Sequence, residues 1–155
     1  MSRSPAGAHP GARAFLSAAF ALALSTAAPA QTTSSIAVTQ AWARATPPTA
    51  PNGALYLTIE NRGAADDSLI ALSTPVAAKA ELHTSAIAGG VMTMTPLPDA
   101  PIKAGQRLEM KPGGTHVMLF GLSHALTSGE TFPVTLDFVK AGAVAATATV
   151  AGMGR

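Results

Sequence analysis

The sequence predicts an all-β domain, an antiparallel sandwich or Greek-key barrel of about seven to nine short strands. Short apolar segments recur along the chain, separated by turns rich in Gly and Pro, of which there are 14 and 12. No segment keeps a helical apolar period over several turns with capping residues. The Ala-rich residues 143–148 are interspersed with β-branched Val and Thr, which favours strand over helix.

The first 30 residues have a different character from the rest. Arg3 and Arg13 precede an uncharged apolar run over residues 14–28, and an Ala-Pro-Ala cleavage pattern closes the segment. Residues 1–30 are therefore expected to be a secretory signal peptide, removed from an exported protein. A membrane anchor is disfavoured because the run is short and polar residues 31–35, a flexible lead-in, follow it.

Charge and cysteine content exclude several classes of protein. Without Arg3 and Arg13, eight Lys and Arg residues balance eight Asp and Glu residues, so no basic surface for nucleic acid is indicated. The sequence contains no cysteine. Disulfides, zinc-thiolate sites, blue-copper centres and a lipid on an N-terminal cysteine are therefore not expected.

The β-domain is expected to occupy residues 36–155. In its first half, Leu55, Leu57 and Ile59 alternate with Tyr56, Thr58 and Glu60, which predicts a strand with the aliphatic side chains on one face. Turn-rich loops separate this strand from its neighbours. The strands expected here lie at residues 35–44, 54–61 and 68–75.

The second half begins with a hairpin over residues 77–98, turning near Gly89-Gly90. Residues 99–106 are expected to form a loop, and Pro112-Gly113-Gly114 a turn between two strands. Residues 123–130, including His124, are expected to be a solvated loop. The remaining strands are expected at residues 107–111 and 115–122 and in a final hairpin over residues 131–152.

Two histidines and two methionines could share one site. His116 and Met118 point to the same face of their strand, because side chains two apart do so. The turn before this strand is expected to present both residues at the exposed start of the strand, while Val117 and Leu119 pack on the other face. The hairpin folds Met94 back on His83. These two residues are diagonal neighbours if the turn is at Gly89-Gly90, and directly opposite if it is one residue earlier.

Two imidazoles and two thioethers would make a soft, neutral site that suits Cu(I) better than Mg²⁺, Ca²⁺ or Zn²⁺. Imidazole must be neutral to bind, so acid should weaken such a site. The competing interpretation is that the methionines fill the core, as methionine often does. Met110, which alternates with Leu108, is assigned to the core, and Met153 is left unassigned.

The spacing of these four residues resembles that of the periplasmic copper chaperones called PCu(A)C. The pattern is His, ten residues, Met, twenty-one residues, His, one residue, Met, and it fits His83, Met94, His116 and Met118 without adjustment. The flanking segments that are also similar to the family are "AWARATPP", "GALYLTIENRG", "GGVMTMTPL" and "KPGGTHVMLFGL". The resemblance covers residues 36–150.

This resemblance implies a cupredoxin-like barrel or sandwich with a Cu(I) site formed by His83, Met94, His116 and Met118. It implies copper delivery to an apo-cuproprotein, such as the copper-site subunit of cytochrome c oxidase, or to another copper chaperone. The chain is not expected to be an enzyme, and it is expected to be a monomer. Many members have Met where this chain has Thr84, so no fifth thioether is expected there. Some members take up Cu(II) with the help of a Met- and His-rich C-terminal tail, and this chain ends in "VAGMGR", so that mode of uptake is not expected and Cu(II) binding itself stays open.

The same residues exclude or disfavour some other functions and leave others open. An electron-transfer cupredoxin needs a cysteine thiolate and is excluded. A hydrolase is disfavoured because only one carboxylate, Glu81, lies near the two histidines in sequence, and no Ser/His/Asp arrangement can be argued. General copper scavenging or storage and a metal-free interaction module remain open, as do the roles of Met92 and Glu81.

Overall fold

A computed structural model describes residues 35–152. The expected signal peptide, most of the lead-in and Met153 lie outside the described residues. Residues 35–152 contain no helix of the length and apolar character needed to cross a bilayer.

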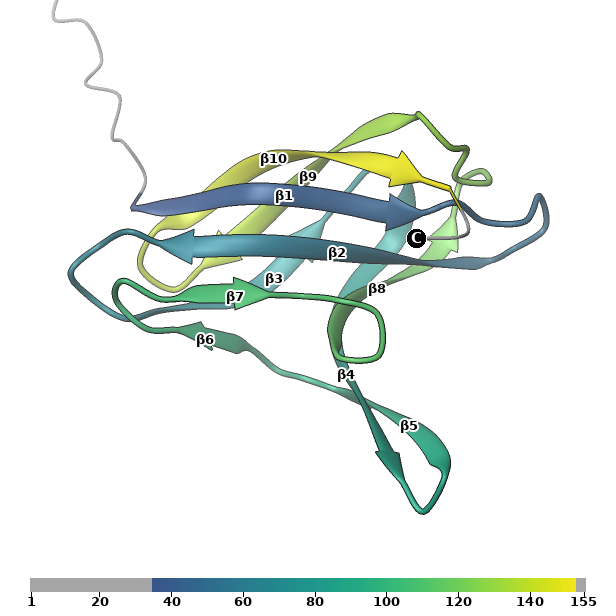
Figure 1. Cartoon of the computed structure of the whole chain (residues 1–155). Coiled ribbons are helices and arrows are strands. Elements are labelled where there is room, and N and C mark those ends of the chain that lie inside the picture. Colours follow the sequence, from purple (N-terminus) through teal and green to yellow (C-terminus); the bar gives the residue numbers. More distant parts are fainter. Residues whose placement is uncertain (1–34, 153–155) are drawn as a thin grey trace, which may run out of the picture. The chain divides into compact units, whose positions relative to one another are not determined.

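The described residues form strands joined by turns and loops, which confirms the all-β prediction (Figure 1). Most strands lie where alternation and turn residues predicted them. Residues 99–106 were expected to form a loop, but they contain a short strand, β6 (Ala100–Ile102). This strand lies at the edge of the sheet, where the missing N–H of Pro101 is tolerated. The ten strands are β1 (Ile36–Arg44), β2 (Asn52–Asn61), β3 (Asp67–Ser73), β4 (Ala77–Ala88), β5 (Val91–Pro96), β6 (Ala100–Ile102), β7 (Arg107–Glu109), β8 (Thr115–Leu122), β9 (Thr131–Phe138) and β10 (Gly142–Ala151).

The strands follow the order β5-β4-β8-β2-β1-β10-β9-β3-β6, with β7 paired to β2. An additional β3–β4 pairing closes this path into a barrel. The pairs are antiparallel as predicted, except that β1 and β10 run parallel. That parallel pair joins the first and last strands, whose relative direction no hairpin turn dictates.

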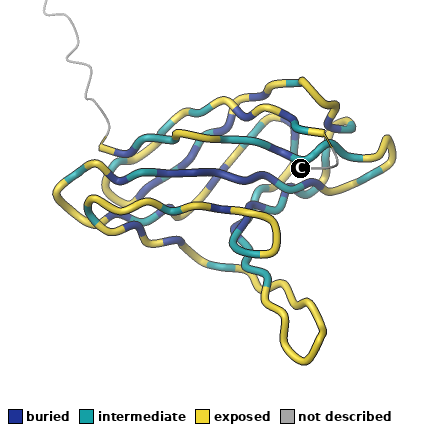
Figure 2. The backbone as a smooth tube through the Cα atoms, viewed as in Figure 1, coloured by how far each residue is buried: buried dark blue, intermediate teal, exposed yellow. Residues whose placement is uncertain are grey.

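The core lies inside the barrel and is aliphatic (Figure 2). Leu55, Leu57 and Ile59 of β2 are buried, as their alternation predicted. Tyr56 and Thr58 on the opposite face of β2 are buried as well. The alternation alone suggested a more open face, but Trp42 stacks on Tyr56 from the neighbouring strand, with ring centroids 4.4 Å apart.

The β4–β5 hairpin projects beyond the barrel, and all six residues of β5 are exposed (Figures 1 and 2). Its turn is Gly89-Gly90, since Ala88 pairs with Val91. Both glycines have positive φ, 59° and 79°, as a two-residue type I′ turn requires. This turn fixes the register that places the β5 methionines relative to the barrel.

Candidate metal centre

The register between β4 and β8 brings the two predicted histidines together. His83 is the direct cross-strand partner of His116, and their ring centroids are 6.1 Å apart. Val117 and Leu119, which point to the other face of β8, are fully buried in the core, as predicted. The pleat of β8 therefore divides the strand into a core face and a face that carries His116 and Met118.

A row of rings crosses four neighbouring strands at this point. Trp42 of β1 stacks on Tyr56 of β2, and the Tyr56 ring centroid lies 6.3 Å from that of His116 on β8. His83 of β4 continues the row. Sequence reasoning did not single out Trp42 or Tyr56, because only the β1–β2–β8 pairing shows that they align with the histidines.

His116 is held by a backbone contact. Its Nδ1–H donates to the carbonyl oxygen of Gly114 at 2.9 Å, which leaves Nε2 as the nitrogen free to bind a metal. The turn before β8 thus orients the ring, as its position suggested. His116 is nevertheless only 4% exposed, so the expectation that it stands at an exposed strand start is wrong. Tyr56 and His83 flank the ring and contribute to its burial.

His83 has an unsatisfied ring. Both nitrogens are buried, and within the described residues neither makes a hydrogen bond of good geometry. The ring centroid lies 5.9 Å from that of Phe120 as well as 6.1 Å from that of His116. Met118 lies between His116 and Phe120 on β8, and its cross-strand partner is Glu81. An orphaned buried imidazole costs free energy that a bound metal ion would recover.

Glu81 is an ionised group close to His83. Its Oε2 lies 3.5 Å from His83 Nε2, and its Oε1 lies 2.7 Å from Lys79 Nζ. The Lys79 ammonium, with a smaller contribution from His83, holds the pKa of the Glu81 carboxyl below its ordinary value. Glu81 therefore remains an anion beside the centre and can orient the His83 ring, the role that the sequence left open.

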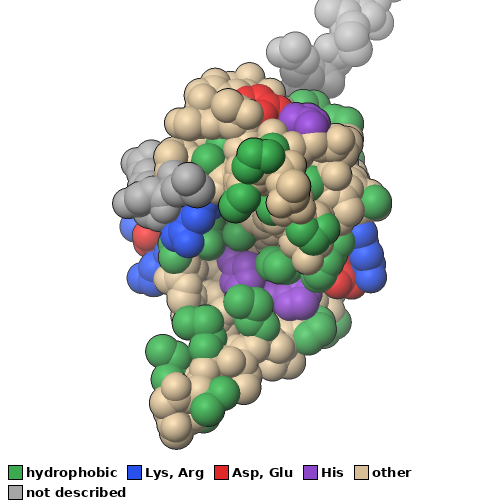
Figure 3. Space-filling view, turned by 90° about the vertical axis from the view of Figure 1, so that its right-hand side faces the viewer, with side chains coloured by type: hydrophobic (Ala, Val, Ile, Leu, Met, Phe, Trp, Pro, Cys, Tyr) green, Lys and Arg blue, Asp and Glu red, His purple; other side chains and the backbone are tan. Residues whose placement is uncertain are grey.

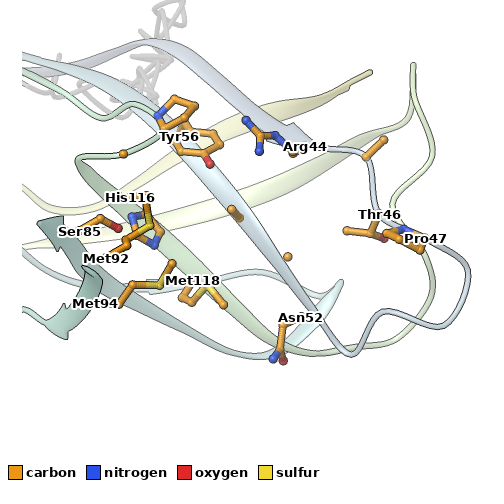
Figure 4. Close-up of a pocket in the computed structure, with 15 residues that line it drawn as sticks. Arg44, Thr46, Pro47, Asn52, Tyr56, Ser85, Met92, Met94, His116 and Met118 are labelled. Atoms are coloured by element: carbon orange, nitrogen blue, oxygen red, sulfur yellow. The ribbon is translucent and has the colours of Figure 1, made fainter. Parts of the chain in front are cut away.

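A cavity of about 530 Å³ opens over His116 (Figure 4). Met118, Met94 and Met92 line it on one side, and Tyr56 and Arg44 on another. No Asp or Glu is among its lining residues. On the molecular surface, histidine side chains are visible in a hollow bordered by hydrophobic side chains (Figure 3).

The structure brings all four predicted ligands to this region, although not equally closely. His116, Met118 and Met94 line the cavity, whereas His83 lies beside it and does not line it. Met94 pairs with Ser85, which makes it the diagonal neighbour of His83, the alternative that the Gly89-Gly90 turn required. Within the described residues, no three His, Cys, Asp or Glu side chains gather as a possible metal site.

Two further assignments can be compared with the structure. Met110 is buried at 3% exposure, as predicted for a core residue.

His124 was expected to be a solvated loop residue, and its side chain is half exposed, but it has two hydrogen-bond partners. Its Nδ1 lies 3.0 Å from Ser123 Oγ, and its Nε2 lies 2.6 Å from Glu130 Oε1. This hydrogen bond from His124 lowers the pKa of Glu130. In the sequence, these contacts could have been suspected only because Ser123 directly precedes His124 and Glu130 ends the same loop.

The β-domain matches the model of a known protein family. The model of the LpqE-like family, described as "Putative lipoprotein LpqE-like", matches residues 36–150. A relative from Leifsonia xyli subsp. xyli, "Putative lipoprotein Lxx21020", is 30% identical over 113 residues. That alignment covers 71% of this chain and 66% of the relative, so the chain spans slightly less than two thirds of the relative's length.

Solved structures of PCuAC domains share this fold. The copper-bound PCuAC domain from PmoF2 has a TM-score of 0.65 and 25% identity, covering 76% of this chain and 93% of that domain. The Cu(I) form of DR1885 from Deinococcus radiodurans has a TM-score of 0.59 and 33% identity, covering 72% and 75%. The apo PCuAC domain from PmoF1 has a TM-score of 0.61 and 28% identity, covering 76% and 94%. The predicted cupredoxin-like barrel is thus confirmed.

Proposed function

Because this chain belongs to the LpqE-like family and has the fold of PCuAC domains, we propose that it is a Cu(I)-binding metallochaperone that delivers copper in the periplasm. The observation that carries the proposal is the pairing of His83 with His116 beside the thioethers of Met94 and Met118. Copper is the cargo of this protein, and the four side chains are proposed as its ligands.

The donor set selects for the soft monovalent ion. The cavity lining contains thioethers and an imidazole but no carboxylate, the donor that hard divalent cations prefer. The buried ring nitrogens of His83 lack good hydrogen bonds among the described residues, so binding an ion would satisfy a group that folding leaves unpaired. Thioethers release no proton on binding, so the charge of Cu(I) would not be neutralised by the ligands.

The exposure of the proposed ligands suggests how they divide the task. His116 is 4% exposed and the His83 side chain is 12% exposed, whereas Met94 is 53% exposed. The imidazoles are held rigidly by the β4–β8 pairing, by the Gly114 carbonyl and by the neighbouring rings. An acceptor can therefore approach from the thioether side while the histidines hold the ion from within. The protein binds and transfers an ion and is not an enzyme, in agreement with the PCuAC domains whose fold it shares.

The proposed acceptor is an apo-cuproprotein, with the copper site of a cytochrome c oxidase subunit as the first choice. The test is to mix Cu(I)-loaded protein with that subunit's apo copper domain and to measure copper on each after separation. Copper should move to the acceptor at stoichiometric concentrations. Retention of Cu(I) by this protein against several acceptors would favour scavenging or storage. Failure to compete with a Cu(I) chelator would favour a metal-free interaction module.

We propose that the protein acts in the periplasm as a monomer. The lipoprotein description of its family supports export. The 155-residue sequence itself contains no cysteine to carry a lipid. Fractionation of cells into periplasm and membrane, followed by detection of the protein, tests this location, and recovery in the cytoplasm would contradict it.

A further inference from the structure

The hairpin carries a thioether that the proposed four-ligand site does not use. Met92 lies two residues before Met94 on β5, so both side chains emerge on the same face of that strand. Both line the same cavity as His116 and Met118 (Figure 4).

Core packing does not account for this methionine. Met92 is 55% exposed, and its cross-strand partner Ile87 is exposed still further, as is Val91. An apolar side chain that remains half in water contributes little to stability. Met110, by contrast, shows what a methionine in this core looks like, since it is almost completely buried.

Resting on the function proposed above, we infer that Met92 is a transfer ligand for Cu(I). It is the outer member of a Met92–Met94 thioether pair through which the ion enters and leaves. The pair lies on the projecting hairpin, where an incoming soft donor can reach it, whereas the histidines lie in the protein body. Met92 is thus assigned to the exchange of the ion rather than to its resting coordination.

The exchange step is a simple ligand substitution. As the Cu–N bond to one imidazole breaks, a Cu–S bond to Met92 forms, and the ion keeps its coordination number. Copper remains Cu(I), because a thioether neither donates an electron to the ion nor loses a proton. The incoming donor then replaces the second imidazole. Without Met92, the ion would have to lose a ligand before the acceptor supplies another, which raises the barrier to transfer.

The test compares equilibrium binding with the rate of transfer in the mature chain. Met92→Leu removes the sulfur but keeps an apolar side chain, and Ile87→Ala changes the adjacent rim without changing any donor atom. Each protein is loaded with Cu(I), and the ion is then captured by excess bicinchoninate in a stopped-flow mixing experiment. Titration with the same chelator gives the equilibrium constant.

Met92→Leu should slow Cu(I) transfer by about tenfold or more, which corresponds to an added barrier of about 1.4 kcal/mol, and should change the affinity little. Ile87→Ala should change neither quantity. Transfer from Met92→Leu at the wild-type rate would overturn the assignment, as would a loss of affinity equal to that of Met94→Leu, which would make Met92 a resting ligand. If the wild-type chain bound no Cu(I), the proposed function would fail together with the assignment.

Discussion

Replacing Met118 by leucine separates the packing role of this side chain from its proposed role as a ligand. Met118 is half-buried on β8, and its side chain lines the cavity beside His116. Leucine has a similar volume and no sulfur. Such a swap usually costs less than about 1.5 kcal/mol of unfolding free energy, so the metal-free variant should remain folded.

The effect on the copper-loaded protein should be larger. At a free Cu(I) concentration 100 times the dissociation constant, binding stabilises the wild-type fold by about 2.7 kcal/mol. If losing one thioether weakens binding by about 100-fold, the gain at the same Cu(I) concentration falls to about 0.4 kcal/mol. For a domain of this size, one kcal/mol shifts the melting temperature by roughly 3–5 °C. Copper should therefore raise the melting temperature of the wild type by about 10 °C and that of Met118→Leu by only about 2 °C.

The assay is thermal unfolding with and without chelator-buffered Cu(I), and Met110→Leu is the matched control. Met110 is 3% exposed and does not line the cavity. Met110→Leu should lower the melting temperature of the metal-free protein through imperfect repacking, yet keep the full rise with copper. The reasoning is refuted if Met118→Leu retains the wild-type rise, or if Met110→Leu loses it.

Three further results are expected. Burial raises the pKa of Asp67, but backbone N–H donors from Ser68, Lys140 and Ala141 outweigh it and leave the pKa below its ordinary value. Asp67→Asn should therefore cost about 2 kcal/mol in denaturant unfolding at neutral pH. The cost should begin to shrink as the pH falls below about 4, where the carboxyl of the unfolded chain binds its proton, and should be lost once the pH has passed the lowered folded-state pKa. An equal cost at neutral and acidic pH would be inconsistent with this. Gly121→Ala should lower the free energy of unfolding more than Gly129→Ala does. Both glycines have positive φ, but of the two only position 121 would place the added Cβ 3.0 Å from another side chain. Equal losses of stability in urea unfolding would contradict this prediction. In acid, protons compete with Cu(I) for both proposed imidazole ligands, so the logarithm of the association constant should fall by up to about two units per pH unit. Chelator titrations that show no pH dependence would exclude the two histidines as ligands.

The sequence predicted the parts of this fold that depend on local pattern. Alternation placed the buried residues of β2 and β8, and Gly89-Gly90 predicted a hairpin whose exact turn then set Met94 diagonal to His83. The i, i+2 rule put His116 and Met118 on one face of their strand. The four proposed ligands could thus be named from spacing and resemblance, without knowledge of the β4–β8 register.

Features that depend on nonlocal pairing were not predictable. The direct pairing of His83 with His116 follows from β4–β8 register, and the Trp42–Tyr56 stack follows from β1–β2 register. No turn connects these strands tightly enough to fix either register from the sequence. The burial of His116 was missed for the same reason, because its neighbours come from other strands.

X-ray absorption at the copper K edge tests the central proposal most directly, on mature protein loaded with one equivalent of Cu(I). Two imidazoles and two thioethers predict a first shell of two nitrogen and two sulfur atoms, with the outer-shell scattering typical of histidine rings. A shell of nitrogen and oxygen alone, with no sulfur, would contradict the assignment of Met94 and Met118 as ligands.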